Sequence, residues 1–351
     1  MLLTHVRVDA FRCIQAAEFR PAPGVNVVRG ANAQGKTSLL EAILFAATSK
    51  SHRTGNEREL LQHGAAAFGV RLEAQRSDRP VTVEARWWQG AKRVKINDIA
   101  QTRLSDVLGK VHVVFFCPED IELVKGSAAA RRRFADMELA QLSTAYLGAL
   151  QQYREALRQR NELLRRPRPD PALLDVYEAQ LAPHGATLMR ERAAFVEELA
   201  GHAAQAYAGI AAGEGFGLRY LPSVETADSL AGALADARER DLRRGVTTLG
   251  PHRDDIALEI AGRPARTYGS QGQQKSAALA IKLAELELVQ ARTEEYPVLL
   301  LDEVLAELDA GRARQLFATV PTAVQCIATT TELEAVPGRF GTTTTDFEIA
   351  H

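Results

Sequence analysis

The chain has 351 residues, of which 46% are hydrophobic, and a formal net charge of -1. This length and composition allow one large or two moderate globular domains with a sizeable core. At this near-neutral charge the attraction of the whole molecule to a polyanion is weak, so any nucleic-acid site must be a local basic patch. The longest aliphatic stretch, Val298 to Leu301, is far shorter than the roughly 20 apolar residues of a membrane-spanning helix.

The N-terminus and the cysteines indicate the compartment. Arg7 places a charge where a secretory peptide would have its hydrophobic region, so we expect no export. Cys13, Cys117 and Cys326 have neither the C-x-x-C spacing of a zinc site nor the even number of a disulfide framework. We therefore expect a cytoplasmic protein that does not associate with a membrane.

The first hundred residues are predicted to form mainly strands and turns. Alternating polarity over Thr4 to Phe11 predicts a strand, and Gly24 to Val28 predicts a second one that leads into a glycine loop and an apolar helix. Further strands, in a mostly antiparallel layer, are predicted at Gly69 to Glu73, Pro80 to Trp88 and Arg93 to Ile96.

The loop between the second strand and the helix matches a phosphate-binding P-loop at every specified position, from Gly30 to Thr37. Its glycines allow successive backbone N–H groups and the helix N-terminus to surround phosphate oxygens. Lys36 is expected to reach the β- and γ-phosphates of ATP as a catalytic group, and Thr37 to bind Mg²⁺ through its hydroxyl. The predicted nucleotide-binding residues of this segment are Gly30, Ala31, Asn32, Ala33, Gln34, Gly35, Lys36, Thr37 and Ser38.

The middle of the chain is predicted to be a helical lobe, because residues from about Ala128 to Tyr207 are rich in Ala, Leu, Arg and Glu at helical spacing. The prolines between Arg165 and Pro171 predict a turn between two antiparallel helices. The arginines of this lobe are candidates for contacts with DNA phosphates, and a solvated face paired with Glu155 and Glu162 is the alternative. They are Arg131, Arg132, Arg133, Arg154, Arg158, Arg160, Arg165, Arg166 and Arg168.

The last hundred residues alternate buried strands with helices. Strands are predicted at Ile256 to Ile260 and Val298 to Leu301, with a helix from Gln273 to about Ala291 between them. A uniformly apolar strand is typical of a parallel sheet covered on both faces. Of the two acids that follow it, Asp302 is expected to hold Mg²⁺ and Glu303 to orient or deprotonate the attacking water. A solvated helix start is the alternative interpretation of these acids.

The segment Ser270 to Gln274, just before the long helix, occupies the place of an ABC signature motif. A serine hydroxyl and backbone N–H groups at a helix N-terminus suit a γ-phosphate, whereas an ordinary helix cap is the alternative role of Ser270. The predicted nucleotide contacts of this region are Ser270, Gly272, Gln273 and, in the D-loop that follows the acids, Asp309.

Five other positions remain open. Arg12 is either a nucleotide contact or a surface arginine, and His252 and Arg253 belong either to an interface or to an ordinary cap. Trp87 and Trp88 could stack on bases, but strand alternation favours burial of one of them.

With these motifs, the chain resembles the RecF family of bacterial recombination mediators. The matching blocks are the P-loop through Ile43, Lys50 to Arg53, Pro118 to Gly126, Arg131 to Phe134, Gly250 to Asp255 and Tyr268 to Gln274. The resemblance implies an α/β fold, namely a P-loop ABC-type ATPase head with an inserted helical lobe and no long coiled coil. We predict lobe I, of mixed sheet and helices, at residues 1–125 and 215–351 and helical lobe II at 126–214, with 268–290 as a segment that could pack with lobe II.

The resemblance also implies a function in recombinational DNA repair and replication-fork maintenance. The expected cofactors are ATP and Mg²⁺, and the expected activity is a weak, DNA-stimulated ATPase. ATP binding would drive homodimerisation on single-stranded, duplex or gapped DNA, slow hydrolysis would drive release, and RecO and RecR would be partners in loading recombinase at gaps.

Two departures and two alternatives accompany the resemblance. Cys326 to Thr331, at the expected switch position, contains no histidine, and Phe115 to Asp120, at the expected Q-loop, contains no glutamine. An ATPase subunit of a membrane transporter is disfavoured by the long insertion between Gly35 and Gly272. An SMC-like structural DNA protein is disfavoured by the short helical arms.

Overall fold

The computed structural model describes residues 1–31, 34–211, 214–307, 310–330 and 343–346. The chain forms two compact units. The first comprises Met1–Asp120, Gln205–Ala212 and Ala278–His351, and the second comprises Ile121–Ala204 and Gly213–Ala277. This division differs from the predicted lobes, because residues 215–277, expected mainly in lobe I, group with the helical unit. The reason is that strand β10 (Asp255–Ile260) packs against helix α3 (Ala128–Leu142).

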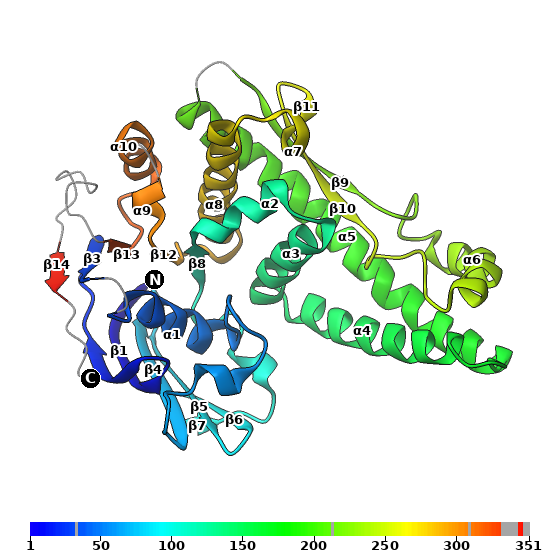
Figure 1. Ribbon diagram of the computed structural model, residues 1–351, viewed down its shortest axis with the longest axis horizontal. Coiled ribbons are helices and arrows are strands. Elements are labelled where there is room, and N and C mark those ends of the chain that lie inside the picture. Colours follow the sequence, from blue (N-terminus) through cyan, green and yellow to red (C-terminus); the bar gives the residue numbers. More distant parts are fainter. Residues whose placement is uncertain (32–33, 212–213, 308–309, 331–342, 347–351) are drawn as a thin grey trace. The chain divides into compact units, whose positions relative to one another are not determined.

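The first unit contains a five-stranded parallel sheet, which carries the predicted phosphate site (Figure 1). Its order is β14 (Thr343–Asp346), β3 (Val25–Arg29), β13 (Cys326–Thr330), β12 (Val298–Leu301) and β8 (Val113–Phe116). Every residue of β8, β12 and β13 is buried, as expected for strands covered on both faces. The predicted bounds of the strand before Asp302 are therefore confirmed.

A six-stranded antiparallel sheet forms the second layer of this unit. Its order is β2 (Ile14–Phe19), β1 (Leu2–Phe11), β4 (Ala67–Gln75), β5 (Pro80–Trp88), β6 (Ala91–Ile96) and β7 (Ile99–Ala100). Side chains of β5 alternate between buried and exposed, so Trp87 stacks on Phe68 in the core whereas Trp88 is 47% exposed. The predicted alternation of the two tryptophans is confirmed.

Helix α1 (Lys36–Thr48) packs against both sheets, because almost all of its residues are apolar or small and buried. The rings of Phe11, Phe45 and Phe68 meet there, with centroids 5.3 to 6.1 Å apart. The unit also contains α9 (Val304–Glu307), α10 (Ala310–Thr319) and single turns of 3-10 helix at Glu57–Leu60 and Leu104–Val107.

The second unit is mainly helical. Besides α3 it contains α2 (Glu122–Lys125), α4 (Thr144–Leu164), α6 (Leu230–Arg244), α7 (Ala265–Tyr268) and a three-stranded sheet of β9 (Phe216–Leu221), β10 and β11 (Arg263–Pro264). The chain passes between the two units within α5 (Pro171–Ile210) and α8 (Gln271–Thr293). A further short turn, Pro118–Ile121, lies at the junction in sequence.

Helices α4 and α5 are antiparallel, as predicted. Arg160 of α4 pairs with Glu178 of α5 at 2.8 Å, and Tyr146 near the start of α4 accepts a hydrogen bond from Arg192, farther along α5. The proline-containing segment 165–170 forms the turn between them. No long coiled coil extends from the described part of these arms, and within the same residues no helix combines the length and apolar character needed to cross a membrane.

Candidate nucleotide site

The P-loop connects β3 to α1, as its sequence predicts. Gly35 precedes the helix with φ 85° and ψ 12°, a left-handed conformation that glycine adopts without steric cost. The backbone N–H of Ala31 donates to Oε1 of Gln34 at 2.7 Å and so closes the loop on itself. Two of the predicted contacts, Asn32 and Ala33, lie outside the described residues.

Lys36 is held at the start of α1. The residue is only 3% exposed, and its Nζ donates to the carbonyl oxygens of Gly30 at 2.8 Å and Ala31 at 2.9 Å. Both acceptors are neutral, so neither supplies a counter-charge for this buried ammonium group. A phosphate oxygen would therefore be a better partner than either carbonyl. Ser38 is also buried, and its hydroxyl lies 3.4 Å from Sγ of Cys13.

Thr37 and Asp302, predicted as metal ligands, lie in contact. The hydroxyl of Thr37 donates to Oδ1 of Asp302 at 2.9 Å, and the hydroxyl of Thr329 lies at the same distance from that oxygen. Burial raises the pKa of the Asp302 carboxyl, and the hydrogen bonds from Thr329 and Thr37 oppose the rise. A hydroxyl and a carboxylate at this spacing fit Mg²⁺, which takes oxygen ligands and commonly uses one or two carboxylates together with substrate phosphates.

Glu303 follows Asp302 and is exposed. Its φ of 53° is left-handed, a strained conformation for a residue with a side chain, and its backbone N–H is held by the hydroxyl of Thr329 at 2.9 Å. Thr329 thus contacts both acidic residues. The segment contains no histidine, and no local sequence pattern marks Thr329, although the parallel register of Leu301 with Ala328 places Thr329 next to the acids.

Arg12 is held by three hydrogen bonds within the protein. Its guanidinium donates to both carboxylate oxygens of Glu41, at 3.0 and 2.8 Å, and to the carbonyl oxygen of Glu59 at 2.9 Å. Glu41 is fully buried and also accepts a hydrogen bond from the Ser51 hydroxyl at 2.5 Å. Desolvation raises the pKa of this carboxyl, but the hydrogen bonds from Arg12 and Ser51 outweigh it, so the net pKa is lowered.

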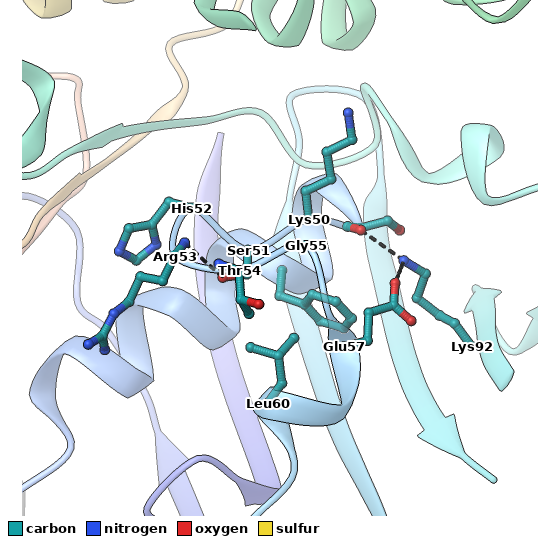
Figure 2. Close-up of a pocket in the computed structure, with 11 residues that line it drawn as sticks. Lys50, Ser51, His52, Arg53, Thr54, Gly55, Glu57, Leu60 and Lys92 are labelled. Carbon is teal, nitrogen blue, oxygen red and sulfur yellow. Dashed lines mark hydrogen bonds and ion pairs between the residues drawn. The ribbon is translucent and has the colours of Figure 1, made fainter. Parts of the chain in front are cut away.

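The loop that begins at Ser49 borders a pocket of about 470 Å³ (Figure 2). Lys92 crosses one side of it, pairing with Glu57 and donating to the carbonyl oxygen of Ser49 at 2.8 Å. Ser51 fixes the loop by accepting hydrogen bonds from the backbone of Arg53 and Thr54. None of the P-loop residues that the structure describes lines this pocket.

Ser270 caps α8 in the structure. The Ser270 hydroxyl accepts from the backbone N–H of Gln273 at 3.2 Å, while the Gln273 side chain accepts from the backbone N–H of Ser270 at 2.7 Å, forming a reciprocal capping box. Ser270 therefore caps this helix, which was the alternative interpretation of the residue. Gly272 lies in the first turn of the same helix, and Asp309 falls outside the described residues. Ser270 belongs to the second unit and the P-loop to the first.

The arginines of the helical unit fall into distinct groups. Arg131 is buried and makes a bidentate pair with Asp255 at 2.7 and 3.0 Å, and Arg160 is fully buried between Asp241 and Glu178. These two are structural residues, not exposed phosphate contacts. Arg158 pairs with Glu155 and Glu162 on a solvated face, which was the alternative interpretation. Like Arg158, five others are exposed, namely Arg133, Arg154, Arg165, Arg166 and Arg168, whereas Arg132 is half-buried.

His252 packs inside the second unit. Its Nδ1 lies 2.7 Å from the Tyr153 hydroxyl and its Nε2 lies 3.0 Å from the carbonyl oxygen of Thr247, while Arg253 donates to the same carbonyl. Burial lowers the pKa of His252 to about 4, and the hydrogen bond to Thr247 opposes the shift. The block Gly250 to Asp255 thus connects to α3, α4 and α5 through buried polar contacts.

Comparison with known proteins agrees with this geometry. The family model described as RecF/RecN/SMC N terminal domain matches residues 2–337. The chain is 39% identical over 350 residues to the DNA replication and repair protein RecF of Bacillus mycoides (strain KBAB4), covering 96% of this chain and 93% of the relative. It is 40% identical over 352 residues to RecF of Staphylococcus aureus (strain JH9), covering 96% and 95%. The chain belongs to the RecF family.

Solved structures support the same assignment. A structure of the recombination mediator protein RecF-ATP in the RecFOR pathway superimposes with a TM-score of 0.89 at 32% identity, covering 96% of this chain and 94% of that one. An SMC head bound to the C-terminal winged-helix domain of ScpA gives a TM-score of 0.56 at 16% identity, which shows a shared fold. The predicted α/β, SMC-like ATPase head is confirmed.

Proposed function

We propose that this protein of the RecF family is an ATP-dependent DNA-binding ATPase of recombinational DNA repair and replication-fork maintenance. The observation that carries the proposal is the contact between Thr37 and Asp302, because it joins the P-loop to the acid-ended strand as an ATP-hydrolysing site requires. The similarity to proteins named for DNA replication and repair, one of them solved as RecF-ATP, supports it. Since its DNA would be chromosomal, the proposal places the protein in the cytoplasm.

The first step is ATP binding at the P-loop. The backbone N–H groups of the loop surround the phosphates, and Lys36 exchanges its two carbonyl partners for oxygens of the β- and γ-phosphates. Thr37 and Asp302 are the residues that would hold Mg²⁺. When bound, this ion neutralises charge on the phosphates.

Glu303 acts in the second step as the catalytic residue. Its carboxylate orients the attacking water and accepts a proton from it, while the water oxygen forms a bond to the γ-phosphorus. The bond from that phosphorus to the oxygen bridging to the β-phosphate breaks, and its electron pair stays with ADP. Thr329 is a positioning residue, because its hydroxyl holds the backbone of Glu303 and contacts Asp302.

Bound ATP then forms part of the interface between two copies of the chain. Ser270, Gly272, Gln273 and Asp309 of a second copy contact the nucleotide held by the P-loop of the first, with two-fold symmetry between the copies. Slow hydrolysis, stimulated by DNA, loosens the dimer and releases the DNA. RecO and RecR are the proposed partners with which the protein loads recombinase at gaps.

An ATPase subunit of a membrane transporter and an SMC-like structural protein use the same phosphate chemistry. Neither is favoured, because the matches to the RecF relatives span 96% of this chain and 93% to 95% of the relatives' own lengths. The short antiparallel arms of α4 and α5 also lack the length of a chromosome-organising coiled coil.

The test is DNA binding by the purified protein with ATP, with ADP and without nucleotide, on single-stranded, duplex and gapped DNA. We expect tight binding only with ATP and a matching loss in Lys36→Ala. Equal binding under all three nucleotide conditions would contradict the proposal, as would ATP hydrolysis that DNA does not change.

A further inference from the structure

A groove in the second unit gathers arginines that the ATPase mechanism does not use. It has a volume of about 190 Å³ and lies between α3, α4 and α5, with His252 at one side. Its floor is apolar, since Leu150 and Leu188 are buried there. Arg132 and Arg133 of α3 and Arg154 of α4 line the same groove.

Positive charge exceeds negative charge around this groove. Four guanidinium groups line it, including that of Arg192, against the single carboxylate of Asp136. That carboxylate is shared, because Arg192 bonds to Oδ1 at 2.7 Å and Arg154 to Oδ2 at 2.9 Å. Burial lowers the pKa of Arg132 and the nearby charge of Arg192 lowers it further, while the carboxylates of Asp255, Asp254 and Asp136 oppose the shift. With four arginines and one carboxylate in its lining, the groove still favours an anion.

The guanidinium groups at the rim can still bind a ligand. Arg133 is exposed and makes no hydrogen bond or ion pair with the described residues. The side chain of Arg154 is 53% exposed and uses one nitrogen for Asp136, and Arg132 uses one nitrogen for the carbonyl oxygen of Asp254. A guanidinium has five N–H donors, so Arg132 and Arg154 each have donors left.

We infer that this groove holds the sugar-phosphate backbone of DNA, with Arg132, Arg133 and Arg154 binding phosphate oxygens. This inference rests on the proposed DNA-binding function and names the residues that carry it. The planar guanidinium group matches the geometry of a phosphate and forms bidentate hydrogen bonds with it. The apolar floor suits the carbon face of a deoxyribose, and the volume equals that of about six water molecules in the liquid, too small for a base pair. Binding here is therefore independent of sequence.

Salt dependence of DNA binding tests the assignment. Arg133→Gln and Arg154→Gln each remove one cation at the groove, and Arg158→Gln removes one from α4 that does not line it and that Glu155 and Glu162 already neutralise. DNA binding is measured by fluorescence anisotropy with ATP on duplex DNA. In each groove variant the negative slope of log K against log salt should become shallower by about 0.9, whereas Arg158→Gln should keep the wild-type slope. Arg133→Lys retains the charge and should restore most of the slope.

The wild-type protein separates failure of this inference from failure of the proposed function. If the wild type does not bind DNA with ATP, the proposed function fails, and the groove assignment falls with it. If the wild type binds and both groove variants keep its slope, the groove is not the DNA site and the proposed function stands. Polyglutamate and inorganic phosphate serve as competitor probes. Groove variants that bind DNA normally but no longer bind polyglutamate would assign the groove to an acidic protein and overturn the inference.

Discussion

The hydroxyl of Thr37 donates a hydrogen bond to Oδ1 of Asp302 at 2.9 Å, although 265 positions separate the two residues in the chain. Parallel pairing of β13 with both β3 and β12 produces this proximity, because the carboxyl ends of all three strands meet at one edge of the sheet. The oxygen atoms of both residues are ligands that Mg²⁺ prefers.

Thr37→Val is expected to weaken ATP binding mainly when Mg²⁺ is present. Valine has nearly the shape of threonine but lacks the hydroxyl oxygen, so the metal loses a ligand while the P-loop keeps its backbone donors. We expect about a tenfold loss of affinity, or about 1.4 kcal/mol, by titration of a fluorescent ATP analogue with Mg²⁺. The loss should be much smaller with EDTA in place of the metal. Thr37→Ser retains the hydroxyl and should bind like the wild type, and equal losses in both media would contradict the metal role of Thr37.

Lys36→Ala and Glu303→Gln should fail at different steps. Loss of the buried Lys36 ammonium removes charge-assisted hydrogen bonds to phosphate, so ATP affinity should fall roughly 10- to 100-fold. Glu303→Gln should bind ATP normally but hydrolyse it about 10²- to 10⁴-fold more slowly, because only the proton acceptor is lost. Equilibrium binding and single-turnover hydrolysis measure the two steps separately. Equal loss of ATP affinity in both variants would remove Glu303 from its role as base.

Arg131→Gln should destabilise the second unit rather than change DNA binding directly. Its side chain is 8% exposed and holds Asp255 with two hydrogen bonds, so its removal leaves a carboxylate without its partner. We expect a loss of about 3 kcal/mol in the free energy of unfolding, measured with urea. The exposed Arg158→Gln should stay within about 0.5 kcal/mol of the wild type. A stable Arg131→Gln protein with a reduced salt slope would instead return Arg131 to the DNA surface.

The sequence could predict the phosphate site because its chemistry depends on local patterns. The P-loop and the apolar strand before Asp302 lie where expected, since the first needs only a strand-loop-helix context and the second only buried apolar residues. Thr329 could not be found in this way. Its role depends on which strand lies beside β12, and strand order depends on the fold of the whole chain.

Three adjacent arginines show a second limit of prediction from sequence. Arg131, Arg132 and Arg133 are adjacent in sequence and carry the same charge, so no pattern distinguishes them. In α3, neighbouring positions point about 100° apart, which buries Arg131 against Asp255 and leaves Arg133 exposed. The partner of Arg131 is 124 positions away. Only the folded structure therefore separates the structural arginine from the exposed one.

Stability should fall below about pH 6.5 because His112 and His252 are buried. Burial lowers the pKa of each to about 4 from an ordinary value of 6.5, so between these pH values the unfolded chain binds more protons than the folded one. The free energy of unfolding should drop by up to about 1.4 kcal/mol per pH unit for each histidine as the pH falls through this window, and should not depend on these groups above it. Urea denaturation at several pH values measures the slope. A His112→Gln, His252→Gln double variant should flatten it, and an unchanged slope would show that other groups dominate.

Ser270→Arg should leave ATP binding by the monomer intact but prevent the ATP-dependent dimer. The exposed Ser270 hydroxyl and the first turn of α8 offer a second set of anion-binding donors, and an arginine side chain would block the approach of another copy. The same change also removes the cap that Ser270 gives Gln273, which costs about 1 kcal/mol. Ser270→Ala is the matched control, because it removes the cap without adding bulk.

Light scattering with ATP, in a background of Glu303→Gln to prevent turnover, separates the two effects. Ser270→Ala should still dimerise, though more weakly, since it retains the backbone N–H donors and the space for the γ-phosphate. Ser270→Arg should remain monomeric at every ATP concentration while binding the nucleotide with wild-type affinity. A Ser270→Arg protein that dimerised with ATP would refute the composite site, because two copies sharing a nucleotide through this helix start cannot close around an arginine side chain.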